Sequence, residues 1–229
     1  MQKKFERTKA LLEQVLEETP TDCYAHYHYA NLHRVKDSQF NTDEIDLLEE
    51  HAARAAQLSE PRNFYGWHTH VMCLELLGWV NFYRKDYAKA VHFGSMAITY
   101  KSNYLDAMFL LGSTYVASDN PEKAIFWFDK YIKTHSKYNP SEECDYIIFH
   151  YLYRQYQAWN AIGKCAERIG DTNLAINAYA AALRERPNYK KAFESLEKFR
   201  DAKLIGDTEW RKYQKLYKGE EHGTVKQNV

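Results

Sequence analysis

Hydrophobic residues recur along the chain with the three- and four-residue spacing of amphipathic helices, and short polar turns separate these segments. The stretch 159–187 shows the pattern best. Gly163 lies on the first of two consecutive helices there, and Ala175 and Tyr179 lie one turn apart on the second. Pro187 follows the second helix, where a missing N–H does least harm. The pattern predicts antiparallel helix pairs that touch through small side chains.

The same spacing recurs upstream of this stretch. Ala124 and Phe128 follow Gly112 by 12 and 16 positions, and a third copy begins at Gly78, 34 residues before Gly112. With these residues the chain resembles the tetratricopeptide-repeat family, whose pattern W-x2-L-G-x2-Y…A-x3-F…P has a period of about 34 residues. The resemblance covers residues 5 to 204. The last copy matches the family pattern at Trp159, Ile162, Gly163, Ala175, Tyr179, Ala182 and Pro187.

The resemblance implies an all-α fold, a right-handed superhelical solenoid of antiparallel helix pairs with about four repeats plus capping helices. We expect a single solenoid over residues 1–218 and a disordered tail over 219–229. The longest insertion, 17 residues between Gly112 and Gly163, predicts a helix that begins near Ser141 and continues to Ile169. The expected parts are an N-terminal helix over 1–20, helix-pair repeats over 21–61, 62–102, 103–140 and 141–187, and capping helices over 188–218.

Composition narrows the classes of partner. The 31 basic and 31 acidic residues balance, which removes the charge argument for a nucleic-acid or anionic-membrane partner. No apolar run approaches the roughly 18 residues of a membrane span, and residues 1–18 form a polar helix rather than a signal peptide. The four cysteines are far apart, which is typical of reduced thiols. We therefore expect a cytoplasmic protein with no nucleic-acid and no membrane partner.

The first helix of each pair is expected to line the concave side of the solenoid. Aromatic and planar polar residues dominate that side, and such residues give large contact areas with few rotamers to order. This composition favours a groove that binds a peptide or partner subunit, although the same rings could fill a tightly wound superhelix. The candidate groove residues are Tyr24, Tyr27, His28, Asn31, Arg34, Met72, Glu75, Trp79, Tyr83, Phe109, His150, Tyr153, Arg154, Gln157, Asn160 and Lys164. Asp106, Ser113 and Val116 share this face.

A variant of the resembled family binds the acidic C-terminus of chaperones through a set of Lys, Asn and Arg side chains. Counted from the first repeat, the equivalent positions here hold Tyr27, Asn31, Leu76, Asp106 and Leu110. Of these five residues, only Asn31 is of the type that the chaperone-binding variant has at the equivalent position. We therefore expect that the chain is not a carboxylate-clamp chaperone binder.

Candidate chemistry is sparse. Two short stretches gather candidate metal ligands: Cys23, His26, His28 and His33 in the first, and His68, His70 and Cys73 in the second. Their spacing matches no closed zinc pattern, so core or rim histidines are favoured. The chain has no phosphate-binding glycine loop, no G-x-S-x-G and no H-E-x-x-H motif. We expect no enzymatic activity, no cofactor and no metal.

These expectations favour a non-catalytic protein–protein interaction scaffold that binds a peptide or partner subunit in an aromatic-rich concave groove. The alternative is an accessory or detached repeat region of a glycosyltransferase-type enzyme that helps to position the enzyme or its acceptor. It rests on residues 11–34, which resemble the repeat tails that follow family 2 glycosyltransferase domains but carry no catalytic residue. A further interpretation is a homo-oligomer formed through the solenoid ends, where Trp67 and Trp210 lie.

Overall fold

The structure is a computed structural model that describes residues 2–32, 34–35, 39–40, 44–59, 66–139 and 147–220. Over these residues the fold is all-α, apart from a two-residue antiparallel pairing of β1 (Arg34–Val35) with β2 (Gln39–Phe40). The helices of this part of the chain are α1 (Gln2–Glu18), α2 (Cys23–Leu32), α3 (Ile45–Leu58), α4 (Trp67–Tyr83), α5 (Tyr87–Tyr100), α6 (Leu105–Ala117), α7 (Pro121–His135), α8 (Gln155–Arg168), α9 (Thr172–Glu185), α10 (Lys190–Asp201) and α11 (Asp207–Lys218).

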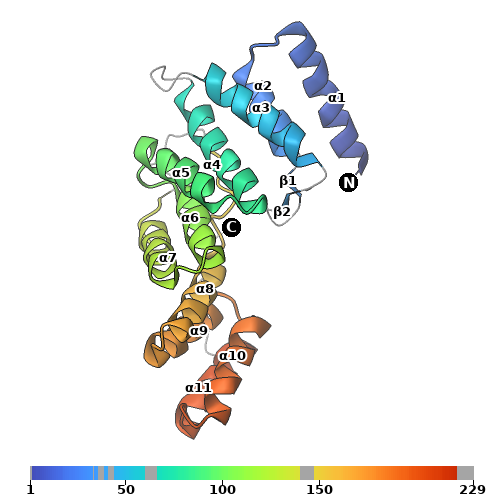
Figure 1. Ribbon diagram of the computed structural model, residues 1–229. Helices are drawn as coiled ribbons and strands as arrows, with labels where there is room; N and C mark the ends of the chain where they lie inside the picture. The colour runs from blue at the N-terminus through green and yellow to red at the C-terminus, as the bar shows by residue number, and fades with distance from the viewer. Residues whose placement is uncertain are drawn as a thin grey trace. The chain divides into compact units, whose positions relative to one another are not determined.

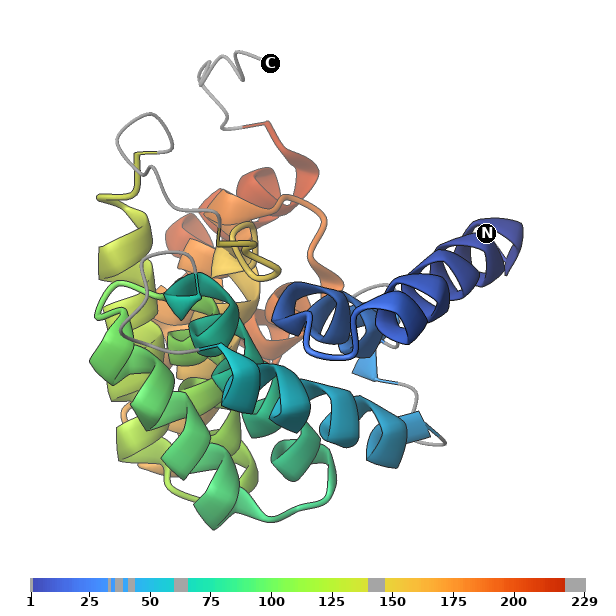
Figure 2. The same ribbon diagram turned by 90° about the horizontal axis from the view of Figure 1, so that it is seen from above.

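The helices form two compact units. Unit 1 consists of residues 1–114 and 137–151, and unit 2 of residues 115–136 and 152–229. In unit 1, α1 lies against α2, α2 pairs with α3, and α4 pairs with α5 (Figures 1 and 2). In unit 2, α7 packs on α8, α8 pairs with α9, and α10 and α11 follow. The chain leaves unit 1 within α6 and returns to it once, between α7 and α8.

Small residues let the helices of unit 1 approach closely. A Cβ at Gly78 of α4 would overlap the side chain of Leu110 on α6. A Cβ at Gly94 of α5 would lie 3.0 Å from the side chain of Leu111. The glycines of the repeat pattern therefore lie where helices meet, as the sequence predicted.

In unit 2, too, a small residue lets two helices approach closely. A Cβ at Gly163 of α8 would lie only 2.6 Å from the ring of Tyr179 on α9, which is fully buried and donates its hydroxyl to Glu167. At the far end of this unit, Trp210 of α11 is buried and stacks on Phe193, with ring centroids 5.1 Å apart. That indole is therefore part of the unit's own core rather than an exposed end.

The helices α5, α7 and α9 begin in the same way. Their N-cap residues Asp86, Asn120 and Asp171 each accept the backbone N–H of the residue three positions further on. The residue before each cap has a left-handed backbone, with φ between 59° and 79°. This turn fixes the point at which each of these helices starts, and it recurs with the repeat.

One predicted helix is wrong over part of its length. The sequence predicted a helix from near Ser141 to Ile169, but α8 begins at Gln155 and residues 147–154 are not helical. Backbone N–H groups in that segment bind side chains instead, including the carboxylate of Asp106. Residues 140–146 lie outside the described residues, as do His33, Pro61 and the tail from 221 onward.

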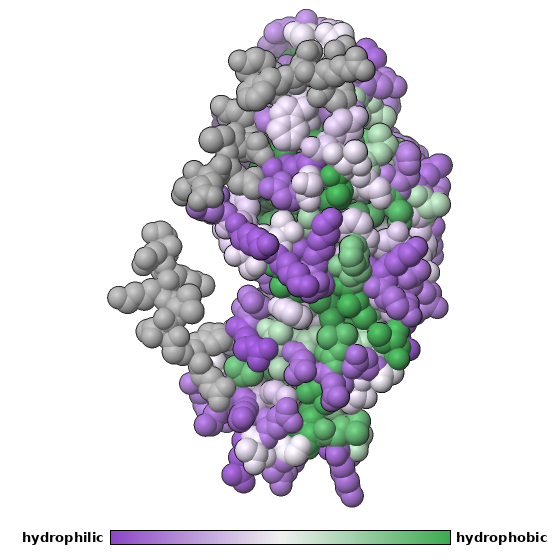
Figure 3. Space-filling model, turned by 90° about the vertical axis from the view of Figure 1, so that its left-hand side faces the viewer, coloured by the Kyte–Doolittle hydropathy of each residue, from purple (hydrophilic) through white to green (hydrophobic). Residues whose placement is uncertain are grey.

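Hydrophilic side chains cover most of the face drawn in Figure 3, and hydrophobic ones gather in a few patches. The exposed apolar residues of the described chain include Phe126, Ile169 and Leu204. Among the described helices, none combines the length and the hydropathy that a bilayer crossing requires. The repeat boundaries and the single solenoid expected from the sequence stay predictions.

Candidate functional site

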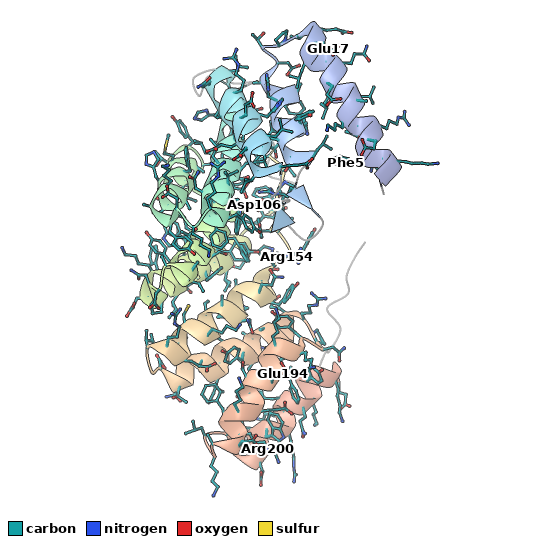
Figure 4. All side chains as sticks on the ribbon, turned by 45° about the vertical axis from the view of Figure 1, so that its right-hand side comes forward. Phe5, Glu17, Asp106, Arg154, Glu194 and Arg200 are labelled. Carbon is teal, nitrogen blue, oxygen red and sulfur yellow. The ribbon has the colours of Figure 1, made fainter. Side chains whose placement is uncertain are left out.

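The candidate site lies in unit 1, where a non-helical stretch of the chain that bends at residues 150 and 151 lies against α4 and α6. We call residues 147–151 the inner segment. We call the side chains beneath it the inner face, which consists of Arg34, Met72, Glu75, Trp79, Asp106 and Phe109. Most of these residues come from α4 and α6, and Figure 4 labels Asp106 on the second of these helices.

Asp106 holds the backbone of the inner segment. The N–H of His150 donates to Oδ2 of this carboxylate at 2.6 Å, and the N–H of Tyr151 donates to Oδ1 at 3.0 Å. The N–H of Ile148 donates to Sδ of Met72 at 3.4 Å. Side chains of the inner face thus replace the backbone partners that a helix or sheet would supply.

An aromatic slot holds the side chain of Tyr151. Its ring stacks on Trp79 at a centroid distance of 5.3 Å and on Phe109 at 4.5 Å, with an interplanar angle of 19° in both cases. The tyrosine is buried. Offset stacking of this kind stabilises by about 0.5–1.5 kcal/mol per pair beyond the burial of area. The slot therefore holds one flat ring, that of Tyr151.

Beside the slot lies a buried ion pair. Nη2 of Arg34 donates to both carboxylate oxygens of Glu75, at 2.7 and 2.8 Å, and both side chains are almost wholly buried. Burial raises the pKa of Glu75, and the charge of Arg34 opposes that rise. The guanidinium of Arg34 thus neutralises the negative charge of one carboxylate of the inner face, that of Glu75.

The second carboxylate of the inner face has no ion-pair partner of this kind. Burial and the charge of Glu75 raise the pKa of Asp106 to about 8, and the N–H groups of His150 and Tyr151 oppose the rise. A buried carboxylate without hydrogen-bond donors is costly. The inner face therefore requires a backbone, or another donor, over Asp106.

These groups predict a pH-dependent stability. Because the pKa of Asp106 rises from 3.8 to about 8 on folding, the folded chain binds an extra proton in that window, and stability falls as pH rises. Burial and the charge of Arg34 lower the pKa of His150 from 6.5 to about 3, so this group raises stability with pH up to about 6.5. The two effects oppose each other below pH 6.5, and above it His150 no longer contributes. The raised pKa of Glu75 acts in the same direction as that of Asp106.

We therefore expect the unfolding free energy of the wild type to fall by about 1–2 kcal/mol between pH 6.5 and 8. The variant Asp106→Asn should show little slope in the same range, because it removes the carboxyl and keeps its size. Urea denaturation at four pH values measures this. Equal slopes for the two proteins would show that Asp106 is not proton-linked to folding.

The structure distributes the candidate groove residues over both units. Arg34, Met72, Glu75, Trp79, Phe109 and His150 meet at the inner face, and the ring of Tyr83 approaches Trp79 at 6.2 Å. On α2, Tyr27 is buried, His28 and Asn31 are half-buried, and Tyr24 is 50% exposed. Tyr153, Arg154, Gln157, Asn160 and Lys164 lie in unit 2.

The members in unit 2 differ in exposure. Tyr153 is 79% exposed, Lys164 is exposed and Asn160 is buried. Arg154 and Gln157 both donate to the hydroxyl of Tyr156, at 3.2 and 3.1 Å. The sequence had placed His150, Tyr153 and Arg154 on a helix, which is wrong because all three precede α8.

Sequence reasoning missed Tyr151, the residue that fills the aromatic slot. Its neighbourhood was interpreted as helix because no proline or glycine interrupts it after Pro140. The one signal in the sequence was the insertion itself, because extra residues between two repeats must pack against some surface of the protein. Tyr156 was also missed. Arg186 donates to its hydroxyl at 2.5 Å and stacks on its ring at 4.6 Å.

The histidines and cysteines of the described chain are dispersed. Nδ1 of His26 lies 3.0 Å from Nδ1 of His51, and Nδ1 of His70 lies 3.0 Å from the carbonyl oxygen of Ala56. Across the residues that the structure describes, no three His, Cys, Asp or Glu side chains come together as metal ligands would. The expectation of no metal and no cofactor stays a prediction.

The fold defines a class: a helical repeat protein, here one whose paired helices in unit 1 hold a non-helical segment of the same chain. The family model of the tetratricopeptide repeat matches residues 105–134 and 156–189. These matches fall on α6 with α7 and on α8 with α9, where the sequence pattern was clearest. Over these two stretches the chain is similar to the tetratricopeptide repeat, and the solved structures below share its fold.

Solved structures share this fold at low sequence identity. A crystal structure of MamA is 19% identical with a TM-score of 0.56, and the match covers 86% of this chain and 91% of that one. A second MamA structure is 19% identical with a TM-score of 0.55 and covers 90% of each chain. YrrB, described as a TPR protein with an unusual peptide-binding site, is 15% identical with a TM-score of 0.58 and covers 85% and 84%. A search of curated proteins gave no match.

Proposed function

We propose that the chain is a non-catalytic protein-interaction scaffold that binds a non-helical peptide of a partner protein on the inner face of unit 1. The observation that carries this proposal is the hold of Asp106 on two successive backbone N–H groups beside an aromatic slot. Main-chain hydrogen bonds give affinity for a peptide backbone, and a side-chain pocket adds selectivity. The description of YrrB as a peptide-binding TPR protein supports the same kind of function here.

The inner face is better suited to binding than to catalysis. Its charged groups are a paired Arg34 and Glu75 and a carboxyl that holds a backbone. Arg34 and Glu75 are therefore occupied by each other, and Asp106 by two backbone N–H groups. A location in the cytoplasm and self-association stay predictions, and so does the accessory role beside a glycosyltransferase-type enzyme, which no contact of the described residues favours.

A peptide display experiment tests the proposal. Random peptides selected on the wild type and on Tyr151→Ala should converge on a short motif, and calorimetry then measures their affinities. Asp106→Asn should weaken the selected peptides at least tenfold, because its amide NH2 replaces one acceptor oxygen and faces a backbone N–H. The matched control is Tyr153→Ala, which removes an exposed ring and should change affinity less than twofold. Selection without a motif, or peptides indifferent to Asp106→Asn, would count against the proposal.

A further inference from the structure

We propose that the inner segment is a displaceable internal ligand of the inner face. We also infer that the partner peptide that replaces it carries an aromatic residue in the slot, preceded by an apolar residue other than proline. The inference rests on the proposed function and adds the chemistry of the peptide and the competitor that it must displace.

The inner segment belongs to an insertion that the repeat fold does not need. Four residues, 101–104, join α5 to α6, and four residues, 186–189, join α9 to α10. In contrast, residues 136–154 separate α7 from α8. The close contacts that set the helix pairs, such as that of Gly163 with Tyr179, involve no residue of the insertion. The glycine contacts between the helices therefore do not depend on the inner segment, whereas the buried Ile147 and Tyr151 add to the core of unit 1.

The hydrogen bonds that hold the segment select for a backbone rather than for its residues. Asp106 and Met72 accept from main-chain N–H groups of positions 148, 150 and 151. A peptide that takes the same bend can offer the same donors, because two successive N–H groups point to one side only where the backbone bends, as it does at positions 150 and 151. A peptide with proline at a bonded position cannot, because proline has no N–H. A partner's peptide can therefore take the same place.

The segment is an imperfect ligand at one position. Nε2 of His150 is buried and has no hydrogen-bond partner among the described residues. A buried polar atom without a partner costs free energy, whereas an apolar side chain of similar size does not. A partner peptide with an apolar residue there should bind more tightly than the chain's own sequence.

The ring of Tyr151 is the part of the segment that a competitor must match. It lies between Trp79 and Phe109, both of which are buried, so the slot accepts a ring and little else. A tethered ligand competes with an effective concentration that can reach the millimolar range. Removal of the ring should therefore open the inner face to peptides from solution.

The test uses the full-length chain and a fluorescent peptide of residues 147–153 that carries His150→Leu and two added C-terminal lysines. Anisotropy titrations compare the wild type, Tyr151→Ala and the control Tyr153→Ala. We expect binding to Tyr151→Ala to be at least tenfold tighter than to the wild type, with Tyr153→Ala within twofold of the wild type. Tyr151→Leu, which keeps apolar volume, replaces Tyr151→Ala if that variant does not fold.

Hydrogen exchange supplies the second readout. Saturation of the wild type with the peptide should deprotect the amides of His150 and Tyr151 at least tenfold. A peptide with alanine at the position of Tyr151 should lose binding at least tenfold.

Three results would overturn the inference. Equal affinities for the wild type and Tyr151→Ala, with both amides still protected at saturation, would show a permanent structural segment. The display experiment could also yield peptides that bind while the amides of His150 and Tyr151 stay protected. That result would show that the inner segment is not a displaceable ligand, and the proposed function would stand. Dimers that form with rising concentration would indicate that two copies exchange the inner segment. The ligand of the inner face would then be a second copy of the chain and not a partner peptide.

Discussion

Replacing Arg34 with methionine should lower the unfolding free energy of unit 1 by about 3–5 kcal/mol. Arg34 and Glu75 are both almost fully buried, so the substitution leaves a carboxylate without its cation. Hydrogen exchange of the α4 amides reports the loss from unit 1 alone, and urea denaturation followed by circular dichroism reports it for the whole chain.

A second substitution tests whether the unpaired charge is the cause. The double variant Arg34→Met with Glu75→Gln removes both charges, so it should recover about half or more of the lost stability. A loss below 1 kcal/mol for Arg34→Met, or no recovery in the double variant, would contradict a paired and buried role for these residues.

The second large effect is expected at Gly163. Valine at this position should destabilise unit 2 by about 2–3 kcal/mol, because its side chain would overlap the buried ring of Tyr179. The ring cannot move aside easily, since its hydroxyl is bonded to Glu167 and its faces are packed in the core. Hydrogen exchange of the α8 and α9 amides measures the change.

Gly206 offers the matched control. A Cβ there meets no atom within 4 Å, and its φ of −77° suits any residue, so Gly206→Ala should change stability by less than about 1 kcal/mol. Tyr179→Leu should relieve part of the clash when it is combined with Gly163→Ala. Equal losses for Gly163→Val and Gly206→Ala would refute the close-packing role of the repeat glycine.

The sequence was sufficient to predict the helix pairs, because their signals are local and repeat. Small residues at Gly78, Gly94 and Gly163 lie where helices touch, and such positions follow from helical spacing alone. Signals for the ends of helices are also local, since proline, glycine and N-cap residues act within one turn of the helix.

The inner segment could not be predicted from local signals. Residues 147–154 carry no helix breaker, yet the backbone N–H of His150 bonds to Asp106, 44 positions away, and the segment is not helical. Tertiary hydrogen bonds and stacking outweighed helix propensity there. The pairing of Arg34 with Glu75 spans 41 positions, so the sequence could put both on one face without pairing them.

The burial of the candidate groove residues was the other property that the sequence could not predict. Tyr27, Trp79 and Phe109 occupy the first helices as predicted, but each is buried, because the positions beside a packing stripe differ from it by only about 100° around the helix. Spacing alone could not separate residues that a partner would touch from those that support them.

The most direct measurement is a crystal structure of Tyr151→Ala with the His150→Leu peptide bound. The account predicts the peptide's tyrosine ring between Trp79 and Phe109 and two of its backbone N–H groups on Asp106, with the chain's own segment displaced. A peptide bound elsewhere, or the chain's own residues 147–151 still in place on the inner face, would contradict it.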